Sequence, residues 1–240
     1  MEQTDTLKNG YKIIQDTERF QFGIDAVLLA DFVVAGGVKS SDSVIDLGTG
    51  TGIIPLLMAG KLPKVSLTGL EVQTESAEMA ARSVALNGLE EQIKIVQGDL
   101  CKVSTLFPRH SFSTVTCNPP YMIDSHGRAN ELDAMSIARH EVLCTLKDVV
   151  AAADYLLAPH GKFFMIHRPF RLPEIFEALA AHKLEPKRMR LIHPFAAKEP
   201  NMVMIEARKN AKRRLTIEPP LVVRDDNGEY TDEIHRIYGD

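Results

Sequence analysis

The feature that most constrains the fold is the regular appearance of short, β-branched runs between residues 43 and 209. Helical apolar spacing separates most of these runs, which are "SVIDLG", "KVSLTGLEV", "QIKIVQGD", "FSTVTC", "KFFMIH", "RMRLIHP" and "NMVMIEAR". Parallel strands need crossover connections, usually helices, so the alternation predicts a doubly wound α/β sheet that is mostly parallel. The last two runs follow each other without a helix. We therefore expect a seven-stranded sheet whose last strand is antiparallel.

The same pattern predicts one domain with an extension at each end. Asn9-Gly10 lies between two short strand-like segments, which is a strong signal of a β-hairpin, and a helical segment follows it. We expect residues 1–40 to form this N-terminal hairpin and helix, residues 41–210 the core, and residues 211–240 a loosely structured C-terminal tail.

Composition excludes several classes of protein. Three cysteines without paired spacing argue against a disulfide framework and a zinc site, so we expect no metal. The chain shows neither a signal-peptide pattern nor an apolar run of membrane-spanning length. We expect a cytoplasmic protein without a membrane partner, and favour a monomer. Net charge is −4, yet residues 182–214 contain ten basic residues against three glutamates. This basic stretch is either a phosphate-binding face or a solvated edge of the sheet.

A glycine-rich loop follows the first core strand, in "VIDLGTGTG" at residues 44–52. Gly48, Gly50 and Gly52 allow a tight turn and a close approach of a ligand to the backbone. Glu71 lies 19 residues beyond Gly52, at the end of the next strand, where an acid can bind both hydroxyls of a ribose. The arrangement predicts a cofactor that contains a nucleoside.

Two cofactors use such a loop, a nicotinamide dinucleotide and S-adenosylmethionine. The dinucleotide requires G-x-G-x-x-G, whereas the spacing here is G-x-G-x-G, preceded by Asp46. A carboxylate beside the loop repels a pyrophosphate but attracts the ammonium group of a methionine. Asp99, after the third strand, can accept a hydrogen bond from an adenine amino group, although Gly-Asp is also ordinary turn chemistry. These residues favour S-adenosylmethionine.

The strand "FSTVTC" ends in the turn Asn118-Pro119-Pro120-Tyr121, which the prolines stiffen. The side-chain carbonyl of Asn118 and the backbone carbonyl of Pro119 can accept hydrogen bonds from the two N–H groups of an amine. An amine whose lone pair is delocalised would then present that lone pair to a methyl donor. Tyr121 offers a face on which a planar substrate can stack. In isolation the turn also fits an ordinary strand ending, in which these residue types are common.

With both motifs in hand, the chain resembles the class I S-adenosylmethionine-dependent methyltransferases of the N-P-P-Y group. More narrowly, it is similar to the bacterial tRNA1(Val) (adenine(37)-N6)-methyltransferase family. The resemblance is carried by "FQFGIDAVLLADF", "DLGTGTGIIPLLMA", "GLEVQ", "NPPY", "ARHE" and "PPL…YTDEIHRIYG". It implies a Rossmann-like fold, a cofactor bound by Asp46, Gly48, Gly50, Gly52 and Glu71, and a target amine bound by residues 118–121. The implied reaction is methylation of N6 of adenine 37 in a valine tRNA.

Several alternatives stay open at this point. N-P-P-Y enzymes also methylate a protein glutamine amide, guanine N2 of ribosomal RNA or adenine in DNA, and a cofactor-dependent RNA-binding module without catalysis is a further possibility. Arg128 is a candidate RNA contact in the polar segment 122–138, which is either a substrate lid or a plain connection. The resemblance places Phe20, Phe22 and Asp25 in a lid over the cofactor, although Asp25 is interpreted rather as a helix-start acid. His167 and Arg168 are expected away from the site and are assigned no role.

Overall fold

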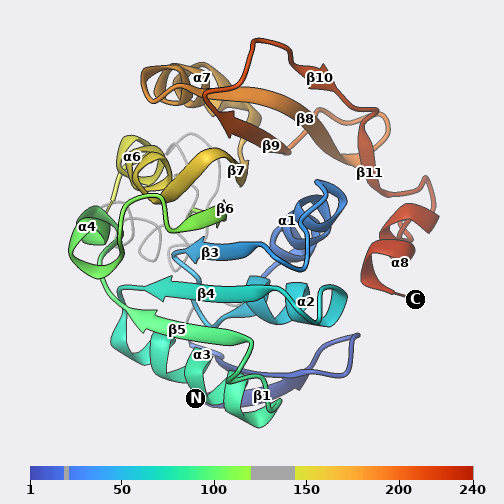
Figure 1. Cartoon of the computed structure of the whole chain (residues 1–240). Coiled ribbons are helices and arrows are strands. Elements are labelled where there is room, and N and C mark those ends of the chain that lie inside the picture. Colours follow the sequence, from blue (N-terminus) through green and yellow to red (C-terminus); the bar gives the residue numbers. More distant parts are fainter. Residues whose placement is uncertain (19–21, 120–143, 240) are drawn as a thin grey trace.

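The computed structural model describes residues 1–18, 22–119 and 144–239, and its elements follow the expected order (Figure 1). The strands are β1 (Glu2–Thr6), β2 (Lys12–Asp16), β3 (Ser43–Leu47), β4 (Ser66–Glu71), β5 (Ile93–Gln97), β6 (Phe112–Cys117), β7 (Leu157–His167), β8 (Leu184–Phe195), β9 (Met202–Lys209), β10 (Thr216–Ile217) and β11 (Leu221–Arg224). The α-helices are α1 (Ile24–Ala35), α2 (Ile53–Lys61), α3 (Thr74–Leu86), α4 (Val103–Leu106), α6 (Leu146–Leu156), α7 (Leu172–Ala181) and α8 (Asp232–Tyr238).

The described strands from β3 onward form one sheet in the order β10-β8-β9-β7-β6-β3-β4-β5, and β11 also pairs with β8. β9 is antiparallel to both of its neighbours, whereas the other pairs of this sheet are parallel. The predicted doubly wound sheet with an antiparallel last core strand is therefore confirmed. The C-terminal strands β10 and β11 enlarge the expected seven strands to nine among the described residues.

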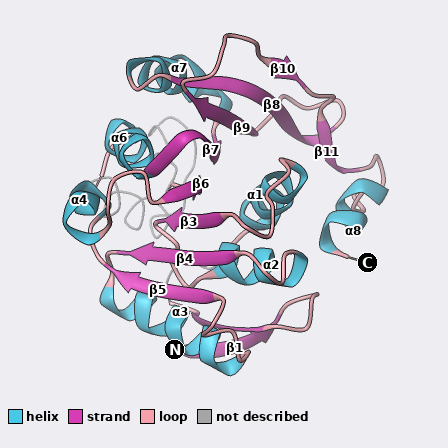
Figure 2. Cartoon of the chain, in the orientation of Figure 1, coloured by secondary structure: helices cyan, strands magenta, loops and turns pink. Residues whose placement is uncertain are grey.

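Helices cover both faces of this sheet (Figure 2). Apolar side chains of α1, α2 and α8 form one buried cluster, and those of α4, α6 and α7 form another. Side chains of β3 alternate between the two, since Val44 belongs to the first cluster and Ile45 and Leu47 to the second. Both faces are thus buried, as expected for a parallel sheet whose strands are continuous apolar runs.

The predicted N-terminal hairpin is confirmed. β1 and β2 pair antiparallel, and Gly10 adopts φ +84° in the turn between them. The hairpin is bonded to α3: the Ile14 backbone N–H donates to Ser83 Oγ at 2.9 Å, and that of Lys12 donates to Asn87 Oδ1 at 2.7 Å. The extension is therefore packed against the core.

The expectation of a loose C-terminal tail is wrong. β11 pairs with β8, and Leu221 of β11 and Ile234 of α8 are fully buried. Arg190 of β8 binds Glu233 of α8, with 2.8 Å between Nη1 and Oε1. The tail therefore completes the sheet and covers the face occupied by α1.

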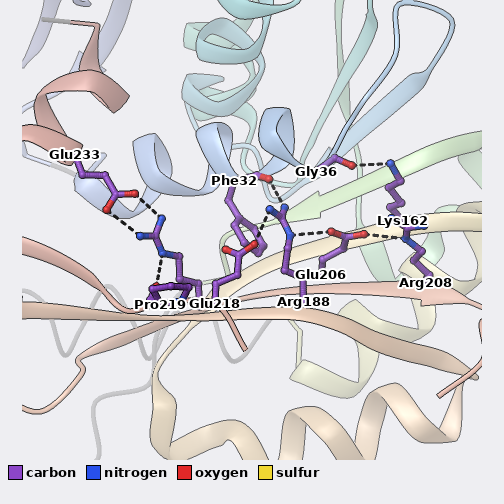
Figure 3. A network of polar contacts seen from close by, with 10 residues as sticks. Phe32, Gly36, Lys162, Arg188, Glu206, Arg208, Glu218, Pro219 and Glu233 are labelled. Atoms are coloured by element: carbon purple, nitrogen blue, oxygen red, sulfur yellow. Dashed lines mark hydrogen bonds and ion pairs between the residues drawn. The ribbon is translucent and has the colours of Figure 1, made fainter. Parts of the chain in front are cut away.

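Helix α1 is bonded at its C-terminal end to the sheet (Figure 3). Its last turn contains no basic residue, but Arg188 Nη2 of β8 donates to the Phe32 carbonyl at 2.7 Å. Lys162 Nζ of β7 donates to the carbonyl of Gly36 at 2.7 Å. Cations at a helix C-terminus satisfy its last carbonyls and complement the helix dipole.

Arg188 also joins α1 to two acids and to an aromatic ring. Its Nε donates to Glu206 at 3.0 Å and its Nη1 to Glu218 at 3.2 Å, and its guanidinium carbon lies 3.9 Å from the centre of the Phe32 ring. Only 4% of the Glu206 side chain is exposed, and Arg208 binds its other oxygen at 2.9 Å. Strand, tail and helix are therefore linked through one guanidinium.

This network changes the interpretation of the basic stretch. Four of its ten basic residues are in ion pairs with acids of the protein, namely Arg188, Arg190, Arg208 and Lys209. Part of the excess positive charge is therefore structural.

Candidate active site

The polar residues expected at the cofactor site follow neighbouring strands. Asp46 is on β3, Glu71 ends β4, Asp99 follows β5 and Asn118 follows β6. The spatial order is β6-β3-β4-β5 and all three pairs are parallel, so their carboxyl ends meet at one edge of the sheet. The structure thus brings together the residues that sequence analysis selected, at the edge where open α/β sheets bind ligands.

Asp46 is buried because of its place in β3. Strand alternation puts it on the same face as Val44, where Thr116 of β6 is its register partner. Thr116 Oγ1 donates to Asp46 Oδ1 at 2.6 Å, and only 2% of Asp46 is exposed. Burial raises the pKa of Asp46 to about 7 and the charge of Glu71 adds to the rise, while the hydrogen bond from Thr116 opposes it.

Two buried oxygens of this site lack protein partners. Among the described residues, neither Asp46 Oδ2 nor Thr49 Oγ1 has a hydrogen-bond partner. An unsatisfied buried acceptor costs free energy, so such atoms indicate a place for a ligand. A donor beside Asp46, above all a cationic one, would satisfy this carboxylate.

The glycine loop uses its own N–H groups within the protein. Those of Gly48 and Thr49 donate to the Leu70 carbonyl at 2.9 and 3.0 Å, that of Gly50 donates to Glu71 Oε2 at 2.9 Å, and that of Gly52 donates to the Thr49 carbonyl at 3.0 Å. A loop that binds a pyrophosphate must offer such groups to the ligand. This loop therefore does not fit a dinucleotide.

Glycine is required in the loop by the backbone conformation. Gly48, Gly50 and Gly52 have φ of +68°, +57° and +86°. Apart from the glycine itself and its two chain neighbours, no described residue has an atom within 4 Å of where a Cβ of Gly48 or Gly50 would stand, so the backbone is open to a ligand at both positions.

Glu71 connects this loop to the end of β4. Its Oε2 accepts from Gly50 and its Oε1 accepts from the Gln73 N–H, both at 2.9 Å, and the residue is 5% exposed. Two carboxylate oxygens offer about four acceptor sites, so hydroxyl groups of a ribose can still be accommodated. The carboxylate thus has a structural role beside the predicted binding role.

A small cavity adjoins the loop on the side of β5. It is lined by Gly48, Leu70, Val72, Gly98, Asp99, Leu100 and Cys144. Val72 is 38% exposed there although it is apolar, which suits contact with a flat ring. Asp99 Oδ1 also accepts from the Cys101 N–H at 2.8 Å, so this residue caps a turn as well as lining the cavity.

Asn118 is oriented by a residue that sequence analysis interpreted differently. Its Nδ2 donates to Asp25 Oδ2 at 3.1 Å, and Asp25 is 7% exposed in the first turn of α1. Pro119, next in the chain, is buried. Pro120, Tyr121 and Arg128, together with the remainder of segment 122–138, lie outside the described residues.

His167 and Arg168 lie at the same edge as the site, contrary to expectation. β7 is parallel to β6, so its end at His167 is beside the end of β6 at Cys117. A cavity there is lined by Pro119, Cys144, Thr145, Leu146, Val149, His167 and Arg171. Burial, then the charges of Arg171 and Arg168, lowers the pKa of His167 to about 4, so this imidazole is neutral at pH 7.

The structure gives little support to other chemistries. Burial raises the pKa of the Cys117 thiol well above its usual value, and the charge of Asp46 adds to the rise, so this cysteine is no thiolate nucleophile. Among residues 1–18, 22–119 and 144–239, no group of three or more His, Cys, Asp or Glu could bind a metal ion. No helix within these ranges is long and apolar enough to cross a membrane.

A comparison with protein families matches the model of the methyltransferase small domain to residues 24–179, more than half of the chain. The chain belongs to this methyltransferase family. The resemblance inferred from the glycine loop and the Asn-Pro-Pro-Tyr turn is confirmed, and the matched residues run from α1 through α7.

Curated relatives match this methyltransferase over most of its length. A protein of Porphyromonas gingivalis is 28% identical over 90% of the chain and 86% of its own length. A protein of Tolumonas auensis is 26% identical over 93% of the chain and 90% of its own length. A protein of a Shewanella species is 27% identical over 88% of the chain and 92% of its own length. All three are named tRNA1(Val) (adenine(37)-N6)-methyltransferase.

Solved structures confirm the fold of this methyltransferase. A crystal structure described as a predicted O-methyltransferase from Agrobacterium tumefaciens superposes with a TM-score of 0.73, at 24% identity over 90% of this chain and 95% of that one. A geranyl diphosphate C-methyltransferase from Streptomyces coelicolor gives a TM-score of 0.58 at 13% identity, over 76% and 78% of the two chains.

Proposed function

We propose that this methyltransferase transfers a methyl group from S-adenosylmethionine to the exocyclic N6 amine of adenine 37 in tRNA1(Val). The observation that carries the proposal is the carboxamide of Asn118, which follows β6 beside the buried acid and the glycine loop of β3. The names of relatives that are 26–28% identical over about nine-tenths of the chain support the choice of substrate.

The residues around the loop fit S-adenosylmethionine. Asp46, with its unsatisfied Oδ2, would bind the ammonium group of the methionine part. Gly48 and Gly50 would form the open backbone beside it, with Gly52 completing the turn, and Glu71 would bind the ribose hydroxyls. Asp99 would accept from the adenine amino group, with Val72 against the ring. When bound, the cofactor would supply an activated methyl group on a positively charged sulfur, with a neutral thioether as its product. The target nitrogen would lose a proton to water.

The Asn-Pro-Pro-Tyr turn would position the target amine. The Asn118 carboxamide oxygen and the Pro119 carbonyl would accept hydrogen bonds from its two N–H groups. The lone pair of the amine nitrogen is then directed away from the ring and toward the methyl group. Pro120 stiffens the turn, and Tyr121 stacks on the base, a contact worth about 1–3 kcal/mol. Arg128 would contact the RNA. No general base or metal is needed, because the methyl donor is already activated.

The cofactor site predicts a specific pH dependence. Because burial raises the pKa of Asp46 to about 7, this acid is largely protonated below that pH and cannot attract an ammonium group. The dissociation constant of S-adenosylmethionine should therefore rise as pH falls below 7, by up to about tenfold per unit. Isothermal titration calorimetry between pH 5.5 and 8 measures it.

Methylthioadenosine is the matched control ligand, because it keeps the nucleoside but lacks the amino-acid part. Its affinity should stay flat over the same pH range. Asp46→Asn should flatten the profile of S-adenosylmethionine as well. If the dissociation constants of both ligands change equally with pH, the proposed role of Asp46 is contradicted.

Methyl transfer to RNA tests the proposed function directly. Wild-type protein is incubated with labelled S-adenosylmethionine and an unmodified tRNA1(Val) transcript, and the nucleosides are separated by mass. We expect N6-methyladenosine, and no label on a transcript with guanine at position 37. Label on guanine, on DNA or on a protein glutamine would instead assign the other substrates of the N-P-P-Y group. Cofactor binding without transfer to any of them would favour a non-catalytic RNA-binding module.

A further inference from the structure

The contact between Asn118 and Asp25 goes beyond helix capping. Asp25 is in the first turn of α1, and its Oδ1 accepts from the neighbouring Ala26 N–H at 3.0 Å. Its other oxygen, Oδ2, is the acceptor for Asn118 Nδ2. The two residues are 93 positions apart, so the contact depends on the tertiary fold.

The chemistry of the two groups fixes how the amide is turned. A carboxylate offers acceptors only, whereas a carboxamide has a donor end and an acceptor end of nearly equal shape. With Asp25 on one side, only the NH₂ end of Asn118 can face it. The carbonyl end is then on the far side of the group, and a rotation of the amide by 180° would place two acceptors against each other.

Asp25 is itself well positioned by the fold. Gly23 lies under the carboxylate, since a Cβ at that position would stand 2.8 Å from Asp25 Oδ1. The N-terminal end of α1 favours a negative charge, and α8 packs against the same helix.

We infer that Asp25 is a positioning residue that keeps the acceptor end of the Asn118 carboxamide turned toward the target amine. The inference rests on the proposed function of Asn118. It predicts that loss of the carboxylate lowers the rate of methyl transfer through Asn118, while the cofactor and the RNA still bind.

Asp25→Asn is the sharpest test, because it keeps the shape and replaces one acceptor by a donor. The new side chain cannot bond both the Ala26 N–H and the Asn118 NH₂ with oxygen atoms. We expect kcat to fall about 30- to 100-fold, with KM for tRNA and Kd for S-adenosylmethionine within threefold of wild type. In an Asn118→Ala background, Asp25→Asn should change the residual rate less than twofold, because residues that act as one unit are not additive.

Asp31→Asn is the matched control. It makes the same substitution on the same helix, where the carboxylate binds Lys61 at 2.5 Å, and it should leave kcat within twofold. Melting temperatures of both variants show whether either fold is damaged. A fall in cofactor affinity instead of kcat, or an unchanged kcat, would overturn the inference.

A second measurement does not depend on activity. Side-chain amide signals of Asn118 in ¹⁵N spectra, assigned with Asn118→Asp, report its hydrogen bond in wild-type protein. We expect one strongly shifted Hδ2 that moves in Asp25→Asn and stays in Asp31→Asn. If neither Hδ2 signal of Asn118 is shifted in the wild-type protein, the contact between Asn118 and Asp25 is refuted. If the shift is present but tRNA is not methylated, the proposed substrate fails while the positioning of Asn118 stands.

Discussion

Asn118→Ala should lower kcat for methyl transfer about 1,000-fold, by analogy with the loss of one preorganised group at a reaction centre. That factor corresponds to about 4 kcal/mol of transition-state stabilisation. The carboxamide provides one of the two proposed acceptors, and alanine provides none. The cofactor contacts proposed for Asp46, Glu71 and the loop are untouched, so Kd for S-adenosylmethionine should stay within a few-fold. Single-turnover transfer to tRNA measures the rate, and calorimetry measures the affinity.

Two further variants separate mechanism from stability. Asn227→Ala removes an exposed asparagine from another turn and should change neither quantity. Asn118→Asp keeps the size of the side chain but sets a carboxylate against Asp25, so it should be inactive and less stable. Activity of Asn118→Ala within tenfold of wild type would contradict the proposed role of the carboxamide.

Arg188→Met should destabilise the protein by about 3 kcal/mol, because breaking a buried ion pair strands the remaining charge. Glu206 is nearly inaccessible to water and would keep only Arg208, while the Phe32 carbonyl at the end of α1 would lose its donor. The free energy of unfolding from urea denaturation measures the change.

Arg208→Met is the control for this prediction, since it removes the other partner of the same carboxylate. The Arg208 side chain is 43% exposed, so its loss should cost no more than about 1 kcal/mol. Arg188→Met combined with Glu206→Met should recover part of the loss, because no buried charge is then stranded. If Arg188→Met and Arg208→Met lower the free energy of unfolding equally, burial does not determine how much each ion pair contributes to stability.

Sequence analysis predicted the features that depend on local pattern. The hairpin at Asn9-Gly10 and the glycine loop between β3 and α2 follow from turn chemistry and from spacing of apolar residues, and both are as expected. The gathering of Asp46, Glu71 and Asn118 follows from the rule that parallel strands end at one edge. The expectations of a monomer and of a cytoplasmic location stay predictions.

Features that depend on distant contacts were missed or misread. The partner of Asp25 is known only once β6 is placed beside α1, so its helix-start pattern hid its contact with Asn118. His167 was assigned to the wrong side because the pairing of β7 with β6 was not considered.

Local signals were also undervalued. Thr145 and Asp148 form a capping box at the start of α6, a pattern visible in "TLKD". In the tail, Pro219-Pro220 suggested loose structure, yet β10 and β11 lie on either side of the prolines at the edge of the sheet, where proline is tolerated.

During synthesis, helix α1 is made well before several of the segments that it packs against, namely β7, β9 and α8. Asp25, near its N-terminal end, accepts a hydrogen bond from Asn118, which comes 93 positions later. The Phe32 carbonyl, near its C-terminal end, accepts one from Arg188, which comes 156 positions later. Glu218 and Glu233, which bind the arginines of β8, come later still. A nascent chain therefore leaves the part of α1 that packs on β7, β9 and α8 uncovered until those elements have been made, which favours premature aggregation.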